Sequence, residues 1–392
     1  MFRIIIIGAG FGGLSCALSL SRFNHDVEIV VLDRKETFDF LPLLPDTLGR
    51  GISPHFLSCR IEPILKKEGL QFIKGEVSSI DLFRKEICYN SEKIDTSTAL
   101  GINPERVKRV ERVNFDYLVI ASGSETNFYG NADIKKSAYT LDSADDAVKI
   151  LSTLKANSFD RFIVGGGGYT GIEVATNLRL WSLANEKETE IIIVEKTDSI
   201  LGPLPQWMKE YTRKNLARLH IEVVAQSSIE RIDGSTVYVS NQKIFDNALV
   251  IWVAGVKTAK FIQELTAEKN TQGRLRVDSS LRLNENCFIV GDAAYVKHKE
   301  NYLRMAIQFA IAQGDLTAKN IIRAIKGKKP VSYKPIDLGY IIPMANNYSC
   351  GNVFGVNLKG KLPTLLHFIM CAYRLHGIRN KIGFIRIFVL HR

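Results

Sequence analysis

Two stretches of the chain share one pattern of apolar and polar positions. Each begins with a short apolar run, RIIII at residues 3–7 and RFIV at 161–164, and each then passes through closely spaced glycines into an apolar helix pattern. Continuous apolar runs of this length are typical of strands buried on both faces of a parallel sheet. The pattern therefore predicts two strand-turn-helix units in an α/β fold.

The glycines of the first unit have the spacing of a phosphate-binding turn. Gly8, Gly10 and Gly13 form G-x-G-x-x-G, which permits a tight turn and brings the backbone against a pyrophosphate at a helix N-terminus. A second strand, VEIVVL at 27–32, ends on Asp33, twenty residues after Gly13, where a carboxylate can bind ribose hydroxyls. This combination predicts an adenine dinucleotide site. The alternative is a structural turn with a surface aspartate.

The second unit repeats the first. Gly166, Gly168 and Gly171 have the same spacing, and the strand EIIIVEK that follows carries Glu195, twenty-four residues after Gly171. An acid at this position favours the free 2′-hydroxyl of NADH over the phosphate of NADPH. Lys196 beside it weakens that preference.

Two complete units imply two dinucleotides bound at once. The useful pairing is FAD, held permanently, with NADH, which binds and leaves after passing a hydride. Two further stretches support the flavin. FDYLVIASGS at 115–124 is a predicted strand running into a turn at Ser122 and Gly123. NENCFIVGDAA at 284–294 is a predicted strand ending on Gly291 and Asp292.

Together these motifs resemble the two-dinucleotide-domain flavoproteins, whose NAD domain is inserted within a discontinuous FAD domain. The resemblance implies two Rossmann-like domains, an FAD domain at 1–144 and 259–330 and an NAD domain at 145–258, followed by a C-terminal region at 331–392. It also implies that Asp292 contacts the ribityl and phosphate of the flavin. The alternative is that Asp292 only caps the following helix.

Several segments resemble, within that family, the type II membrane-peripheral NADH:quinone oxidoreductases. They are LDRKETFDFLPLLPDTLGRG (32–51), IASGSETNFYG (120–130), GYTGIEVATNL, LVIWVAGVK (249–257) and GNVFG (351–355). The resemblance implies that Pro42 and Leu43 contact the cofactor and that Glu173 is a catalytic residue near the nicotinamide and flavin. The alternative for Glu173 is a carboxylate in the first turn of its helix, where the helix dipole favours it.

The predicted acceptor site departs from that family. The family commonly has two glutamines four residues apart in a helix, which here begins near Met305; Gln308 fits the first, and the resemblance implies that it lines the acceptor site. Ala312 stands in the second place and Gln313 follows it. Thr364, His367 and Cys371 replace the usual tryptophan and histidine of the C-terminal helix, and residues 90–113 resemble an inserted charged loop.

The C-terminal segment is basic and partly apolar. From residue 359 to 392 it has seven Lys and Arg and no acid, in a chain whose net charge is +11. LPTLLHFIMCAY and IGFIRIFVL, which lie within it, are too short to span a bilayer. We expect helices lying on an anionic lipid surface, which places the protein peripherally on the cytoplasmic face of the cell membrane. The alternative is that these helices pack on the protein's own body or on the second subunit of a homodimer.

The sequence thus predicts an FAD-dependent NADH:quinone oxidoreductase without proton pumping. Three alternatives stay open. One is a reductase for a soluble electron carrier. Another resembles the sulfide:quinone oxidoreductases, although Cys350 lacks a partner cysteine between residues 88 and 287. The third is a flavin-bound protein that binds nucleic acid, for which the charge is permissive but no motif is present. The six cysteines show no metal-ligand spacing, so no metal is expected.

Overall fold

The computed structural model describes residues 1–23, 26–94 and 106–390, which form two compact units. The first unit contains Met1–Phe38, Arg60–Glu125 and Val256–Asp337, and the second contains Asp39–Cys59, Thr126–Gly255 and Leu338–Arg392. Each unit is built around a parallel sheet, which confirms the predicted α/β fold class. The predicted boundaries of the FAD-binding and NAD-binding domains stay predictions.

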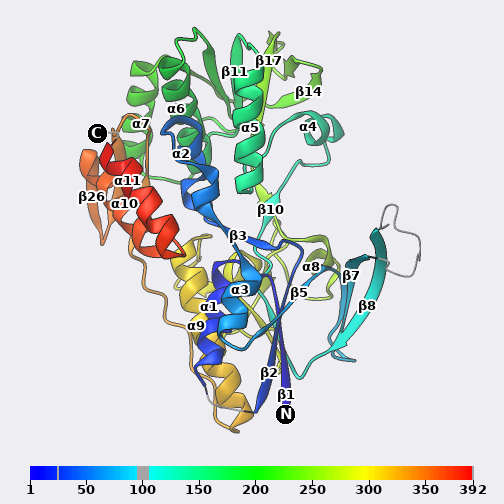
Figure 1. Cartoon of the computed structure of the whole chain (residues 1–392). Helices are drawn as coiled ribbons and strands as arrows, with labels where there is room; N and C mark the ends of the chain where they lie inside the picture. Colours follow the sequence, from blue (N-terminus) through cyan, green and yellow to red (C-terminus); the bar gives the residue numbers. More distant parts are fainter. Residues whose placement is uncertain (24–25, 95–105, 391–392) are drawn as a thin grey trace. The chain divides into compact units, whose positions relative to one another are not determined.

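The first unit has a five-stranded parallel sheet with the order β20-β9-β1-β2-β5. Its strands β1 and β2 run side by side in Figure 1. Its strands are β1 (Phe2–Ile7), β2 (Val27–Asp33), β5 (Gln71–Lys74), β9 (Tyr117–Ile120) and β20 (Cys287–Ile289). The central strand β1 is buried from Ile4 to Ile7, as its continuous apolar run predicts. The helices of this unit are α1 (Phe11–Ser21), α3 (Ile61–Lys67), α8 (Lys260–Glu264) and α9 (Ile307–Ile325).

The helices α1 and α9 lie side by side (Figure 1) and approach closely at two glycines. A Cβ added to Gly314 would lie 2.3 Å from the carbonyl oxygen of Gly12 and 3.0 Å from the nitrogen of Cys16. A Cβ on Gly12 would lie 3.3 Å from the carbonyl oxygen of Ala310. Small residues therefore let the backbones of the two helices touch.

The described parts of the segment predicted as a charged loop at 90–113 are strands. β6 (Glu76–Asp81), β7 (Glu86–Ile94) and β8 (Arg106–Asn114) form a three-stranded antiparallel sheet in which β7 and β8 pair along their full length. The loop prediction was wrong at 90–94 and 106–113, because alternating residues here satisfy the backbone of a hairpin. Residues 95–105 lie outside the described part of the chain.

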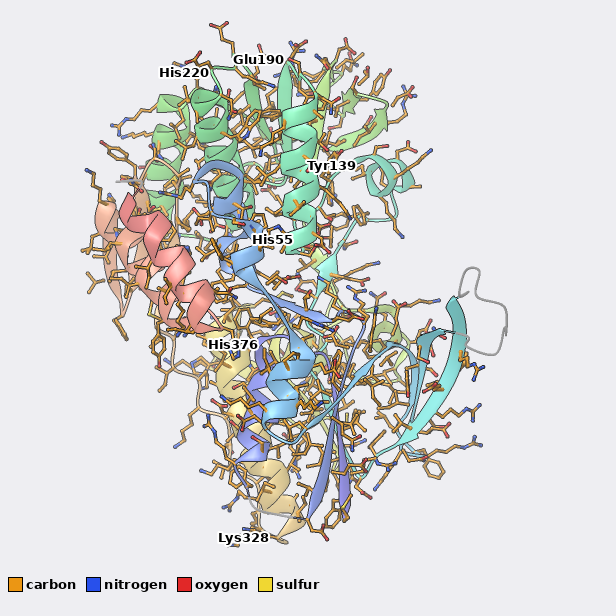
Figure 2. The ribbon with its side chains drawn as sticks, viewed as in Figure 1. His55, Tyr139, Glu190, His220, Lys328 and His376 are labelled. Carbon is orange, nitrogen blue, oxygen red and sulfur yellow. The ribbon has the colours of Figure 1, made fainter. Side chains whose placement is uncertain are left out.

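The second unit has a four-stranded parallel sheet with the order β13-β12-β11-β17. Its strands are β11 (Arg161–Gly165), β12 (Glu190–Val194), β13 (Ile221–Val224) and β17 (Ala248–Trp252). Tyr139, labelled in Figure 2, extends the sheet beside β17: its N–H donates to the carbonyl of Val250 and its carbonyl accepts from the N–H of Trp252, at 2.9 and 2.7 Å.

The second unit also contains further helices and two antiparallel sheets. Its helices are α2 (Leu44–Gly49), α4 (Ala132–Ser137), α5 (Ala144–Ala156), α6 (Tyr169–Ala184), α7 (Gln206–Arg218), α10 (Lys361–Arg374) and α11 (Ile378–Leu390). Its antiparallel sheets contain β14 (Ile229–Asp233), β15 (Thr236–Val239) and β16 (Ile244–Phe245), and β24 (Gly339–Ile342), β25 (Ser349–Val353) and β26 (Val356–Gly360). The short elements are η1 (Leu41–Leu43) and η2 (Pro54–Leu57).

Short strands and one turn of helix complete the chain. They are β3 (Thr37–Asp39), β4 (Ser58–Arg60), β10 (Glu125–Thr126), β18 (Val256–Lys257), β19 (Leu275–Arg276), η3 (Gly291–Ala293), β21 (Ala294–Tyr295), β22 (Lys297–His298) and β23 (Asn301–Tyr302). No helix in the described ranges is both long enough and apolar enough to cross a bilayer.

The contact between α1 and α9 gives a test of the fold. We expect Gly314→Ala to lower the free energy of unfolding by about 1–3 kcal/mol, because the added methyl must push two backbones apart. The change is measured by denaturant unfolding. Lys319→Ala, at an exposed position of the same helix, is the control and is expected to leave stability within about 0.5 kcal/mol of the parent. Equal stability of the two variants would contradict the close approach.

Candidate functional site

The first glycine turn joins β1 to α1, and its middle glycine differs in role from the two outer ones. Gly8 has a φ of +99°, and a Cβ there would lie 2.4 Å from the carbonyl oxygen of Ala121. A Cβ on Gly13 would lie 1.8 Å from the carbonyl oxygen of Gly8. A Cβ on Gly10, in contrast, would have no described atom within 4 Å. The outer two glycines are required by the protein's own packing, whereas the middle one leaves space beside the backbone.

Asp33 at the end of β2 holds this turn in place. Its carboxylate accepts a hydrogen bond from the N–H of Ala9 at 2.6 Å and another from the N–H of Lys35 at 2.8 Å. Since a carboxylate offers about four lone-pair positions, ribose hydroxyls can still bind to it. The acid predicted to bind the cofactor therefore also fixes the loop that is predicted to bind its phosphates.

The second glycine turn, between β11 and α6, repeats this geometry. Gly166 has a φ of +110°, and a Cβ there would lie 2.8 Å from the Cα of Ala254. A Cβ on Gly171 would lie 1.9 Å from the carbonyl oxygen of Gly166, while one on Gly168 would have no described atom within 4 Å. The two turns are thus built alike, although they belong to different units.

Glu195 occupies in the second unit the place that Asp33 has in the first. Its carboxylate accepts from the N–H of Gly167 at 2.6 Å, and from the N–H and hydroxyl of Thr197, both at 2.8 Å. The acid that follows the second strand therefore binds the central amide of the glycine turn in both units.

The Gly291–Asp292 segment follows β20 in the first unit. The Asp292 carboxylate accepts from the hydroxyl of Ser124 at 2.9 Å, and burial raises its pKa. The alternative that Asp292 caps the following helix was wrong, because α9 begins at Ile307 and its N-cap residue is Ala306. The segment is a single 3-10 turn rather than a helix start.

Two buried side chains that the sequence did not indicate hold this segment. Gln313 lies in α9 with 2% of its surface exposed, and its amide oxygen accepts from the N–H of Gly291 at 2.7 Å. Arg274 donates to the carbonyl oxygens of Asp292 at 3.0 Å and Ala294 at 2.6 Å. Gln313, which stands one residue beyond the expected glutamine position, is therefore a brace for the Gly-Asp turn.

Ser122 and Gly123 form the turn after β9, as predicted. Gly123 has a φ of +65°. The hydroxyl of Ser122 is buried and has no hydrogen-bond partner among the described residues. A buried hydroxyl normally has a partner, so this atom can bond to a bound molecule.

Gln308 lies in the first turn of α9, and its helix starts two residues later than the predicted Met305. Its amide donates to the carboxylate of Asp337 at 3.1 Å. Asp337 is also paired with the guanidinium of Arg304, at 2.8 Å for the Nη2 to Oδ1 contact. Gln308 thus belongs to a polar network of the first unit.

Glu173 lies on α6 in the second unit, beside residues of α2 and α10. Because α6 begins at Tyr169, Glu173 is not in the first turn, and the helix-dipole alternative for it was wrong. Burial and the neighbouring Asp46 carboxylate raise the pKa of Glu173 well above its usual value. Asp46 was not predicted, and burial raises its pKa to about 6 although the Arg50 guanidinium opposes the shift.

Pro42 and Leu43 lie in the short helix η1, which clusters with the second unit. Leu43 is fully buried, which packing alone accounts for. The assignment of Pro42 and Leu43 to the cofactor stays a prediction.

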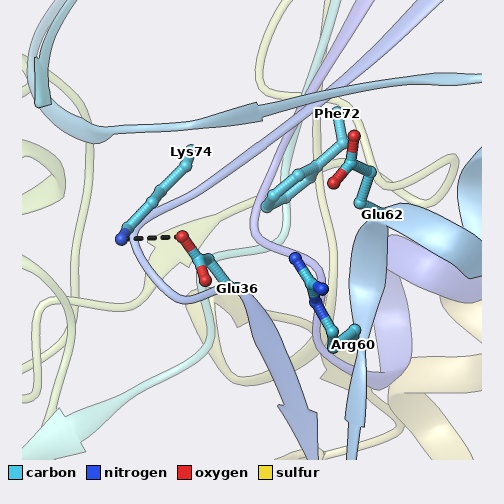
Figure 3. Close-up of a pocket in the computed structure, with 5 residues that line it drawn as sticks. All are labelled: Glu36, Arg60, Glu62, Phe72 and Lys74. Carbon is cyan, nitrogen blue, oxygen red and sulfur yellow. Dashed lines mark ion pairs between the residues drawn. The ribbon is translucent and has the colours of Figure 1, made fainter. Parts of the chain in front are cut away.

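A pocket of about 200 Å³ lies in the first unit and is lined by Glu36, Arg60, Glu62, Phe72 and Lys74 (Figure 3). Figure 3 shows the Lys74 ammonium directed at the Glu36 carboxylate, 2.9 Å away. Lys74 is paired in the sheet with Asp33, so the pocket adjoins the residue predicted to bind ribose.

The residues present fit two dinucleotides. Each turn has space at its middle glycine, backbone N–H groups at a helix N-terminus and a carboxylate at the end of the next strand. The unpaired hydroxyl of Ser122 and the Asp292 carboxylate add polar groups on the same unit as the first turn. Within the described ranges no cluster of three or more His, Cys, Asp or Glu could hold a metal ion.

The chain is similar to known proteins over most of its length. The family described as pyridine nucleotide-disulphide oxidoreductase matches residues 2–314. The demethylphylloquinone reductase NdbB of Synechocystis is 26% identical over 389 residues, which cover 95% of this chain and 92% of that protein. The type II NADH:quinone oxidoreductase of Staphylococcus saprophyticus is 23% identical over 412 residues, or 96% of each chain.

Solved structures share the fold over nearly the whole chain. NDH2 from Plasmodium falciparum in complex with NADH superimposes with a TM-score of 0.81 at 19% identity, covering 99% of this chain and 97% of that one. The sulfide:quinone oxidoreductase of Aquifex aeolicus superimposes with a TM-score of 0.77 at 18% identity, covering 98% and 92%.

The different roles of the glycines give a matched pair of variants. We expect Gly10→Ala to fold with parental stability, because its φ of −74° suits alanine and the Cβ meets no described atom, but to bind flavin about ten-fold to 100-fold more weakly. Gly13→Ala is expected to lose stability as well, since its Cβ clashes with a backbone oxygen. Thermal unfolding and flavin content after purification measure the two effects. Full flavin content in Gly10→Ala would exclude this turn as the phosphate site.

Proposed function

The chain belongs to the pyridine nucleotide-disulphide oxidoreductase family, and we propose from this premise that it oxidises NADH and reduces a membrane quinone. The observation that carries the proposal is the duplicated glycine turn, each copy braced by the acid of the next strand. The relatives named as quinone reductases match nearly the full chain and so support the choice of acceptor.

The two turns divide the cofactors between them. The turn at Gly8, Gly10 and Gly13 holds FAD, with Asp33 on the ribose and the pocket beside Lys74 next to it. FAD, when bound, accepts a hydride and gives up electrons to a second acceptor. Ser122, Gly123, Gly291 and Asp292 bind the remainder of that cofactor. The turn at Gly166, Gly168 and Gly171 holds NADH, and Glu195 selects it against NADPH by repelling a 2′-phosphate.

In this proposal Glu173 donates the proton that quinone reduction takes up. The overall reaction, NADH + quinone + H⁺ → NAD⁺ + quinol, takes up one proton. Burial and a neighbouring carboxylate raise the pKa of Glu173, so this carboxyl keeps its proton to higher pH than an ordinary glutamate and can donate it. Water then returns a proton to Glu173. Gln308, with its amide held by Asp337, lines the acceptor site.

The alternative chemistry of a sulfide oxidoreductase finds less support. Such enzymes need reactive cysteines, and burial raises the pKa of Cys16, Cys59, Cys287, Cys350 and Cys371. A thiol with a raised pKa is a poor nucleophile.

The C-terminal helices α10 and α11 support a peripheral contact with anionic lipid on the cytoplasmic face of the membrane. One side of α10 is buried within the second unit through Thr364, Phe368 and Cys371. The other side of this helix pair exposes large apolar side chains, namely Leu362, Ile369, Met370, Tyr373, Ile378, Ile382 and Ile385. Lys361, Arg374 and Lys381 stand among them, as in interfacial helices.

The half-reactions provide the direct test. We expect NADH, added without oxygen to the purified flavoprotein, to bleach the flavin spectrum, and a quinone to restore it. Glu173→Gln is expected to bleach normally but to recover at least about ten-fold more slowly, because general acid catalysis is removed. Bleaching without recovery in the parent protein would exclude quinone as the acceptor.

Vesicle flotation tests the lipid contact. We expect the triple variant Ile369→Ser, Tyr373→Ser, Ile378→Ser to bind anionic vesicles at least about ten-fold more weakly, because it loses exposed apolar surface. Phe83→Ser is the control, since Phe83 is 96% exposed on the other unit. Equal loss in both variants, or none in either, would contradict a contact through α10 and α11.

A further inference from the structure

The second unit brings together a group of buried and half-buried ionisable side chains that dinucleotide binding does not explain. Asp46 comes from α2 and Arg50 follows that helix, while Glu173 lies on α6. His367 and Cys371 face them from α10, with the Cys371 sulfur 3.6 Å from His367 Nε2. These positions are distant in sequence, so the fold has gathered them.

Asn177 forms hydrogen bonds to both acidic residues, Glu173 and Asp46. Its side-chain amide donates to the backbone carbonyl of Glu173 at 2.9 Å and also hydrogen-bonds to the side chain of Asp46. The two helices touch at this level, because a Cβ on Gly49 would lie 2.3 Å from the carbonyl oxygen of Asn177. Only 3% of the Asp46 surface is exposed to solvent, so water solvates its carboxyl group little.

Arg50 forms an ion pair with Asp46. Its Nε lies 2.9 Å from Asp46 Oδ1. Its Nη2 donates to the carbonyl of Met344 at 3.2 Å and to Asn347 Oδ1 at 2.9 Å, and the guanidinium stands 5.0 Å from the ring centre of Phe368. Contacts on three sides hold the cation beside Asp46.

Among the side chains that the structure describes, the group has one ion-paired cation, Arg50, for two carboxyl groups. Arg50 can neutralise only one of the two acids. His367 and Cys371 are neutral near pH 7, because burial and Arg50 lower the pKa of His367 to about 4 and burial raises that of the Cys371 thiol. The Arg374 guanidinium, which opposes the shift of Cys371, is the other cation near this group. Two unshielded carboxylates in one buried site repel each other strongly.

We propose that Asp46 and Arg50 are a positioning pair: Asp46, ionised and clamped by Arg50, keeps the neighbouring Glu173 carboxyl protonated and able to donate. The inference rests on the proposed function, in which Glu173 supplies the proton that quinone reduction consumes. Asp46 acts through Glu173 and need not touch the substrate.

The pair is tested by counting protonated carboxyl groups in the flavin-loaded enzyme by infrared spectroscopy at neutral pH. Glu173→Gln identifies the band of Glu173. We expect Asp46→Asn to lose that band, because Glu173 then ionises as the partner of Arg50. Arg50→Met is expected to gain a second band, because Asp46 loses its counter-ion. Opposite changes in two variants of one cluster are not produced by general unfolding.

The pH profile of turnover supplies a second readout. In Asp46→Asn the limb that reports loss of the Glu173 proton is expected to move to lower pH by about one to two units. Asp46→Glu restores a carboxylate and is expected to return the limb toward the parent position. Glu188→Gln, an exposed carboxylate of the same unit, is the control without effect.

The results distinguish a failure of the positioning pair from a failure of the proposed function. A Glu173 band that persists in Asp46→Asn, or a pH limb that does not move, overturns the pair even if NADH and quinone turn over. The expected band pattern, together with flavin that quinone fails to reoxidise, would instead overturn the proposed acceptor and leave the pair standing.

Discussion

One hydrogen bond recurs in both units and sets the geometry of each dinucleotide turn: a carboxylate at the end of the second strand accepts from the central amide of the glycine loop. Asp33 makes it to Ala9 and Glu195 makes it to Gly167, each at 2.6 Å. The bond fixes the loop against the sheet before any ligand binds, which is the preorganisation that phosphate recognition needs. The position of the acid at the end of the second strand is what makes this bond possible in each unit.

The local part of this architecture could be predicted from the sequence. Strands, glycines and terminal acids lie within about thirty residues of one another, and their spacing is dictated by backbone geometry. Gly10 and Gly13 belong to the same motif, yet the structure separates their roles. Only the neighbouring atoms reveal that one glycine serves the fold and the other leaves room for a ligand.

Long-range contacts could not be predicted. The motif places Asp46 and Arg50 after the first ribose acid, but in the structure they cluster with the second unit and with α10, more than 300 residues further on. Arg274 and Gln313 were missed for the same reason: their partners are backbone groups of another segment. Gln313 also shows that a one-residue shift along a helix moves a side chain from an exposed face, where Ala312 lies, to a buried one.

The different surroundings of the glycines in the two turns have an evolutionary consequence. Residues 8, 13, 166 and 171 are held by the protein's own backbone, whereas residues 10 and 168 border open space. Selection for folding alone would therefore preserve the first four and leave the last two to drift. In a descendant that kept this fold but abandoned one dinucleotide, side chains would accumulate first at residue 10 or at residue 168, and which of the two had changed would tell which ligand had been given up.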